Sequence, residues 1–191
     1  MKHLLITFAL TLALIAVPAM ASDGMTVRGV DVPGTLSVDG NDLVLNGAGN
    51  RSRWFMNLYV GSLYLPEHSS DPQAIIEADE PMAITLHITS GMINSERMTS
   101  ATEEGFENAT GGNTAPIQEY IDQFMGVFEE EIVEGDVFNI AYVPANGVKV
   151  YRNGELTGEV DGGMAFKQAL FGIWLSDAPA QGSLKEAMLG E

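Results

Sequence analysis

Residues 53–65, RWFMNLYVGSLYL, form a nearly continuous apolar stretch that is rich in aromatic and branched side chains. Such side chains favour β-strands, and an apolar run without alternation is typical of a strand with both faces covered. The fold must therefore place further elements on both sides of a sheet that contains this strand. The glycine-rich segment before it, residues 47–51, is interpreted as a flexible turn.

Alternating or branched apolar segments, separated by turn dipeptides, predict the remaining strands, and a helical period predicts the helices. This order of elements is typical of an α+β domain in which helices cover one face of a mostly antiparallel sheet. We expect strands at 26–32, 35–38, 43–45, 82–89, 137–143, 148–152 and 155–160, and helices at 71–78, 94–109, 114–128, 164–175 and 184–189.

The first residues have the three parts of a cleavable secretory signal peptide: a basic start, an apolar run at 4–17 and small residues around a cleavage site. The apolar run is shorter than the ~20 residues that a membrane-spanning helix needs, which argues against an uncleaved anchor. We therefore predict a signal peptide at 1–21, one domain at 22–191, no membrane span after cleavage, and a periplasmic location.

The chain has 26 acidic and 9 basic residues, a formal net charge of −17. Nucleic acid is therefore excluded as a partner, and anionic lipid headgroups are disfavoured, because both need clustered Lys and Arg. The absence of Cys excludes disulfides, a thiol nucleophile and a thiolate zinc site. We predict no metal and no cofactor, because His68 and His87 are isolated and residues 46–51 lack the lysine of a phosphate loop.

Arg51 and Arg53 stand out because they are two of very few cations and lie at the start of the most apolar strand. An arginine beside apolar surface needs an anionic or carbonyl partner. One interpretation is an ion pair with one of the many carboxylates. The other is a cation that receives the carboxylate of an apolar ligand.

Residues 43–66, LVLNGAGNRSRWFMNLYVGSLYLP, resemble the opening strand pair of the chalcone isomerase-like superfamily, with a Gly-x-Gly-x-Arg pattern before an aromatic strand. The closing block at 166–190, FKQALFGIWLSDAPAQGSLKEAMLG, is similar to the exported bacterial branch of that family. The resemblance covers about residues 35–190. It implies an open-faced β-sandwich, a large antiparallel sheet covered by a layer of helices, with a cleft between the two.

The family includes enzymes that cyclise chalcones and relatives that bind fatty acids without catalysis. The resemblance matches the cleft arginine of the family to Arg51. The hydrogen-bonding residues of the enzymes fall near Leu58, Asn94 and Ala101, where this chain does not keep their residue types. Leu58 and Ala101 have no side-chain donor for a substrate oxygen, so chalcone cyclisation is not expected.

We therefore predict a non-catalytic periplasmic protein, with no catalytic residue, that binds a small apolar carboxylate of a fatty-acid-like or aromatic kind. Arg51 would bind the anion, with Tyr59, Met98 and Phe106 as wall residues. One alternative is an isomerase or intramolecular lyase on an unknown small molecule, in which Arg51 polarises an oxygen and Thr99 or Tyr59 substitutes for a missing donor. Another is a protein-interaction module of the cell envelope, and the oligomeric state is not predicted.

Overall fold

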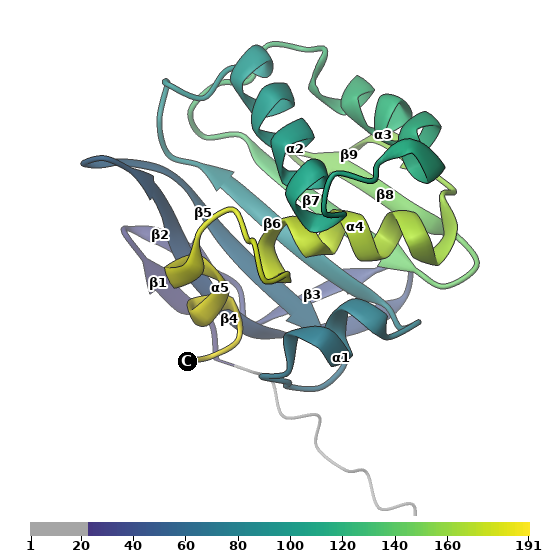
Figure 1. The fold of residues 1–191 in the computed structure, drawn as a ribbon. Coiled ribbons are helices and arrows are strands. Elements are labelled where there is room, and N and C mark those ends of the chain that lie inside the picture. Colours follow the sequence, from purple (N-terminus) through teal and green to yellow (C-terminus); the bar gives the residue numbers. More distant parts are fainter. Residues whose placement is uncertain (1–22) are drawn as a thin grey trace, which may run out of the picture.

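The computed structural model describes residues 23–191, which form a curled antiparallel sheet of seven strands with helices over one face (Figure 1). The expected α+β sandwich is confirmed. The predicted signal peptide lies outside the described residues. Each strand pairs with the next along the chain: β3 (Thr35–Val38), β4 (Asn41–Arg53), β5 (Met56–Leu65), β6 (Met82–Ile88), β7 (Val137–Val143), β8 (Gly147–Arg152) and β9 (Glu155–Val160).

The helices gather on one face of this sheet, and a two-stranded ribbon lies on the other (Figure 1). None of the helices in residues 23–191 has the length and hydropathy that a membrane crossing requires. The helices are α1 (Pro72–Glu77), α2 (Ser95–Ala109), α3 (Gln118–Met125), α4 (Gly163–Leu175) and α5 (Gly182–Met188), and the ribbon is β1 (Met25–Val27) with β2 (Val30–Val32).

Two hydrophobic cores result, one on each face of the sheet. The larger core joins the sheet to the helices, and the smaller core lies under the ribbon. In β5, Leu63 belongs to the first core and Tyr64 to the second, because successive side chains of a strand point to opposite faces. The prediction of a strand with two covered faces is therefore confirmed from Leu58 to Leu65, while Met56 and Asn57 are exposed.

The predicted turn at residues 47–51 is wrong, because these residues belong to β4. A Cβ on Gly47 would lie 2.2 Å from the carbonyl oxygen of Ala187, and one on Gly49 would lie 2.7 Å from the Ala187 Cβ. The glycines therefore let α5 pack directly on the strand. The turn comes later, at Trp54 and Phe55, between β4 and β5.

Two smaller expectations also differ from the structure. The predicted strand at 26–32 is the hairpin of β1 and β2, because Arg28 and Gly29 adopt positive φ angles of 51° and 85°. The predicted helix at 114–128 is α3 flanked by two short 3-10 turns, and Thr114 makes no capping hydrogen bond.

Helix α1 is held at both ends. The Asp71 side chain accepts hydrogen bonds from the N–H groups of Gln73 and Ala74, as its N-cap position predicts. At the other end the fully buried Lys167 of α4 donates to the carbonyl oxygens of Ile75, Ile76 and Ala78, at 3.0, 2.8 and 2.7 Å. The three acceptors give this lysine a structural role.

Candidate functional site

A cavity of about 630 Å³ lies where the end of the β4–β5 hairpin meets α2 and the end of α4. It falls within the range of ~300–1,000 Å³ that is usual for small-molecule sites. Its lining combines apolar side chains with several charged ones. The lining includes the cations Arg51, Arg53 and Arg97, the carboxylates Glu96 and Glu104, and the side chains of Trp54, Leu58, Tyr59, Met98, Ala101 and Trp174.

Strand pairing brings Arg51 and Tyr59 together. They are direct partners in the β4–β5 register, and an irregularity in the pairing beside them leaves Leu58 without a partner on β4. A bulge of this kind redirects side chains. Leu58 and Tyr59 consequently both belong to the helix-side core and both line the cavity.

Tyr59 is buried, and its hydroxyl oxygen accepts a hydrogen bond of 3.0 Å from the indole N–H of Trp174. The guanidinium carbon of Arg51 lies 5.9 Å from the centre of the Tyr59 ring. Burial raises the pKa of Tyr59, and the positive charge of Arg51 only partly opposes this effect. The phenol is therefore protonated at neutral pH, and Arg51 supplies the positive charge beside it.

Arg51, Arg53 and Arg97 all line the cavity. Among the described residues, none of the three has a carboxylate within 4.0 Å, although the chain carries 26 acidic residues. Arg97 donates to the backbone oxygen of Met92 at 2.7 Å. An arginine offers five donors in a planar fork, so the group retains capacity for an anion.

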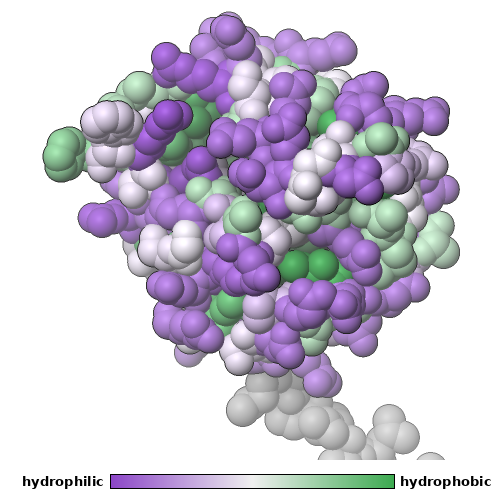
Figure 2. Space-filling model, in the orientation of Figure 1, coloured by the Kyte–Doolittle hydropathy of each residue, from purple (hydrophilic) through white to green (hydrophobic). Residues whose placement is uncertain are grey.

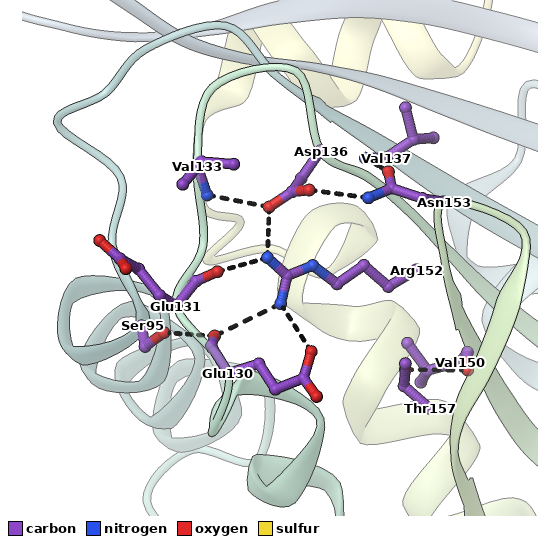
Figure 3. A network of polar contacts seen from close by, with 10 residues as sticks. All are labelled: Ser95, Glu130, Glu131, Val133, Asp136, Val137, Val150, Arg152, Asn153 and Thr157. Carbon is purple, nitrogen blue, oxygen red and sulfur yellow. Dashed lines mark hydrogen bonds and ion pairs between the residues drawn. The ribbon is translucent and has the colours of Figure 1, made fainter.

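Arg152 shows what a structurally paired arginine looks like in the same molecule (Figure 3). Its guanidinium donates to the Asp136 carboxylate at 2.6 Å and to the backbone oxygens of Glu130 and Glu131. Burial alone would raise the pKa of Asp136, but hydrogen bonds from Arg152, Asn153 and the Val133 N–H hold it below its usual value. All of these partners of Arg152 belong to the protein itself, so its guanidinium does not need a ligand as a partner.

The structure brings three of the four predicted ligand-binding residues to one cavity: Arg51, Tyr59 and Met98. Phe106 does not line it. This side chain is fully buried and packs against the rings of Phe124 and Phe166, with centroid distances of 6.1 and 5.7 Å. The helical period placed Phe106 on the inner face of α2 but could not distinguish the core from the cavity wall.

Sequence reasoning missed Arg97, Trp54 and Met92 as lining residues. The available signal for Arg97 was that it is the single cation of α2, one residue before the inward-facing Met98. Trp54 was assigned to a buried strand, because apolar character alone favours burial.

Leu58 and Ala101, the two apolar positions matched to enzyme residues by the resemblance, both line the cavity. Asn94 instead caps α2, where its side chain accepts from the Arg97 N–H at 3.0 Å. Thr99 is not among the lining residues, whereas its neighbours Ser100 and Thr102 are. Tyr59 is the one proposed substitute donor that reaches the cavity wall.

A second hollow of about 560 Å³ lies between α1, the end of α2 and α4. Its lining includes Asp177 but no lysine or arginine. Within residues 23–191, no three His, Asp or Glu side chains come together as potential metal ligands. The first cavity has three arginines against two glutamates, Glu96 and Glu104, in its lining, whereas the second has a carboxylate and no cation, so the first is the better site for an anion.

The curled antiparallel sheet with helices over one face, and a cavity between them, defines the chalcone isomerase-like class of fold. A family model described as chalcone isomerase-like matches residues 24–190, and the chain belongs to this family. A fatty-acid binding protein of Arabidopsis thaliana has a similar structure, with a TM-score of 0.66 and 16% identity over 84% of this chain and 92% of that one. No curated protein sequence matches this chain.

Proposed function

We propose that this protein binds a small apolar carboxylate, fatty-acid-like or aromatic, in the arginine-lined cavity and does not transform it. The observation that carries the proposal is the set Arg51, Arg53 and Arg97. They outnumber the two glutamates in the cavity lining, and none of them has a described carboxylate within 4.0 Å. In a chain with a net charge of −17, such unpaired cations indicate a site for an external anion.

Arg51 is the central cation of the three. It is half-buried and lies against the Tyr59 ring, so a carboxylate that it binds would be partly shielded from water. Apolar wall residues such as Leu58, Met98 and Ile173 lie in the same cavity and suit a hydrocarbon or aromatic body. The Arabidopsis relative, described as a fatty-acid binding protein, supports this ligand class.

The binding test compares decanoate with decanol, which share a chain but differ in the anion, by isothermal titration at neutral pH. We expect decanoate to bind with one-to-one stoichiometry and decanol to bind at least ten times more weakly. A charge-assisted hydrogen bond contributes about 1.5–3 kcal/mol, so Arg51→Ala should weaken decanoate binding about 10- to 100-fold. Equal affinity of the folded variant would refute the role of Arg51.

Arg28→Ala is the matched control, because Arg28 is an exposed arginine in the β1–β2 turn and lines neither hollow. It removes the same charge from the molecule. We expect it to leave decanoate affinity within twofold of the wild type. A loss equal to that of Arg51→Ala would mean that net charge, not the cavity, controls binding.

The proposal includes a periplasmic location and membership of the exported bacterial branch of the family, both supported by the signal-peptide pattern at 1–21. The test fuses residues 1–30 to an alkaline phosphatase that lacks its own leader, in a Gram-negative host. We expect active phosphatase in the periplasmic fraction. Activity that is absent, although the fusion is made, would contradict export.

The second candidate function is isomerisation or intramolecular lysis of a small molecule. It is favoured by one observation, the buried and protonated Tyr59 hydroxyl beside Arg51 in the cavity wall. Incubation with chalcones and enone acids tests it. Turnover by the wild type that is lost in Tyr59→Phe would support catalysis. If the wild type leaves these substrates unchanged, the binding function is favoured.

A further inference from the structure

The end of the β4–β5 hairpin carries three exposed apolar side chains, Trp54, Phe55 and Met56, which we call the aromatic tip. Trp54 is 83% exposed, Phe55 is fully exposed and Met56 is 39% exposed. Trp and Phe side chains each bury about 150–250 Å² when they are covered. Several large apolar side chains exposed to water on one small part of the surface indicate an interaction site.

The end of the β4–β5 hairpin, which carries the aromatic tip, projects from the body of the protein (Figure 1). Pairing between β5 and β6 ends at Tyr59 and Ile88, and the Thr89 N–H donates to the Leu58 carbonyl oxygen at 3.0 Å, so only Met56 and Asn57 of β5 extend beyond this neighbour. Figure 2 shows a largely hydrophilic face, with hydrophobic residues protruding at the left margin, where the hairpin ends in Figure 1. The apolar surface is therefore presented on a projection.

The backbone at the aromatic tip is not relaxed. Trp54 adopts a φ of 60° in a two-residue connection between Arg53 and Met56. Hairpin loops of this length favour Gly, Asn or Asp at positive φ, because a bulky side chain is strained there. The folding of the hairpin does not explain a tryptophan at this position, which points to a role outside the fold.

The base of the hairpin is fixed. The Ser52 N–H donates to the side-chain oxygen of Gln181 at 2.9 Å, and the Gln181 amide donates to the Asn50 carbonyl at 3.2 Å. The segment before α5 thus clamps both sides of Arg51. The aromatic tip is held at a defined distance from the body.

The aromatic tip is continuous with the opening of the cavity. Trp54, Met56 and Arg53 line it, together with the partly exposed Met92, whereas Phe55 does not. Arg53 is exposed and has no described carboxylate within 4.0 Å. A phosphate group outside the protein would complement it.

We propose that the aromatic tip inserts into the interface of a neutral phospholipid surface, with Arg53 against lipid phosphates, so that the cavity opens at the membrane. Trp is enriched at the membrane–water interface, and Phe is among the apolar side chains that peripheral proteins bury at the boundary between headgroups and acyl chains. The lipid is zwitterionic, because the net charge of −17 repels an anionic surface. This inference rests on the proposed function in one respect: the surface would be the source or destination of the apolar carboxylate.

A protein partner is a poorer fit. A stable protein interface buries about 800 Å² on each side, whereas two aromatic side chains supply at most about 500 Å². A narrow wedge of this size suits insertion between lipid headgroups. A second copy of the chain, joined tip to tip, is the remaining alternative, and the experiment distinguishes it.

The test is co-flotation of ligand-free protein with phosphatidylcholine vesicles, so that it does not depend on carboxylate binding. We expect the wild type to float with the vesicles and Phe55→Ser to lose at least tenfold in partitioning. Leu156→Ser is the matched control, because Leu156 is half-exposed on the edge strand β9. It should float like the wild type.

Tryptophan fluorescence gives a second measurement, since Trp54 is exposed and Trp174 is buried. Brominated phosphatidylcholine should quench the wild type but not Trp54→Phe. Phe55→Ser should bind decanoate normally, because Phe55 does not line the cavity. This keeps a failure of membrane docking distinct from a failure of ligand binding.

Two results would overturn the proposal. One is a wild-type protein that remains unbound to the vesicles or is bound no better than Phe55→Ser. The other is a concentration-dependent dimer in sedimentation that Phe55→Ser abolishes and vesicles do not dissociate, which would assign the aromatic tip to self-association.

Discussion

Arg51 and Tyr59 are direct partners across β4 and β5, and the guanidinium carbon lies 5.9 Å from the centre of the phenol ring. The pair combines a cation with a flat apolar support at the wall of a cavity. Because the Tyr59 hydroxyl is occupied as an acceptor from Trp174, the ring orientation is fixed from the helix side as well. Separate substitutions of the two residues can therefore distinguish the contribution of the Arg51 charge from that of the Tyr59 ring.

Tyr59→Phe removes the acceptor of the buried Trp174 N–H and keeps the ring under Arg51. An unsatisfied buried donor costs about 1–3 kcal/mol, so we expect a loss of that size in the free energy of unfolding, measured by urea denaturation. Decanoate affinity should remain within threefold. If the folded variant loses decanoate instead, the phenol and not Arg51 is the main anion partner.

Ala101→Phe should fill the arginine-lined cavity, because Ala101 lies on the exposed side of α2 and lines it. We expect decanoate affinity to fall at least tenfold with little change in the unfolding midpoint. The control is Ala165→Phe, the same change at an exposed helical position that lines the second hollow. The assignment of the site fails if Ala165→Phe is the variant that loses binding.

Lys167→Met tests the link between α4 and α1. Methionine fills a similar volume but leaves the carbonyl oxygens of Ile75, Ile76 and Ala78 without their donor. We expect a loss of about 2–4 kcal/mol at pH 7, since each unsatisfied buried acceptor costs about 1–3 kcal/mol and some acceptors gain water. Unfolding by urea at pH 7 measures this difference.

The same pair of proteins should show a defined pH dependence. Burial lowers the pKa of Lys167 to about 8, below the usual lysine value of 10.5. Between these values the unfolded chain binds more protons, so stability from this group increases as pH rises and is lost as pH falls through about 8. The stability difference between wild type and Lys167→Met should widen from pH 8 to pH 10. A constant or shrinking difference would contradict the shift.

Gly47→Ala should displace α5, because its Cβ would lie 2.2 Å from the Ala187 carbonyl oxygen. We expect a lower unfolding midpoint and faster amide hydrogen exchange in α5 (Gly182–Met188) than in α2. Gly126→Ala, directly after α3, is the control, because Gly126 has a helical φ of −57° and the added Cβ meets no atom within 4 Å. Unchanged exchange in α5 would show that the close approach is not needed.

Local patterns predicted most elements of the fold, because strand alternation and helix periodicity depend on neighbouring residues. They failed at Gly47 and Gly49, where the reason for glycine is the approach of Ala187, far along the chain. The burial of Lys167 was also not predictable, since its acceptors lie at the end of another helix. Contacts of this kind arise only when the whole chain is folded.

The site was predicted in part for a related reason. Arg51 could be found because a cation beside an apolar strand is unusual, and the family pattern pointed to the same residue. Phe106 and Trp54 were misplaced, because hydrophobicity favours burial without specifying whether a side chain meets the core, a cavity or the outside. Phe106 is fully buried, and Trp54 is 83% exposed.

Native mass spectrometry of the protein purified from its host, followed by solvent extraction, tests the central claim most directly. We predict a stoichiometric added mass that is identified as a fatty or aromatic acid, is absent from Arg51→Ala and is retained in Arg28→Ala. A folded Arg51→Ala protein that carries the same acid in the same amount would contradict the account.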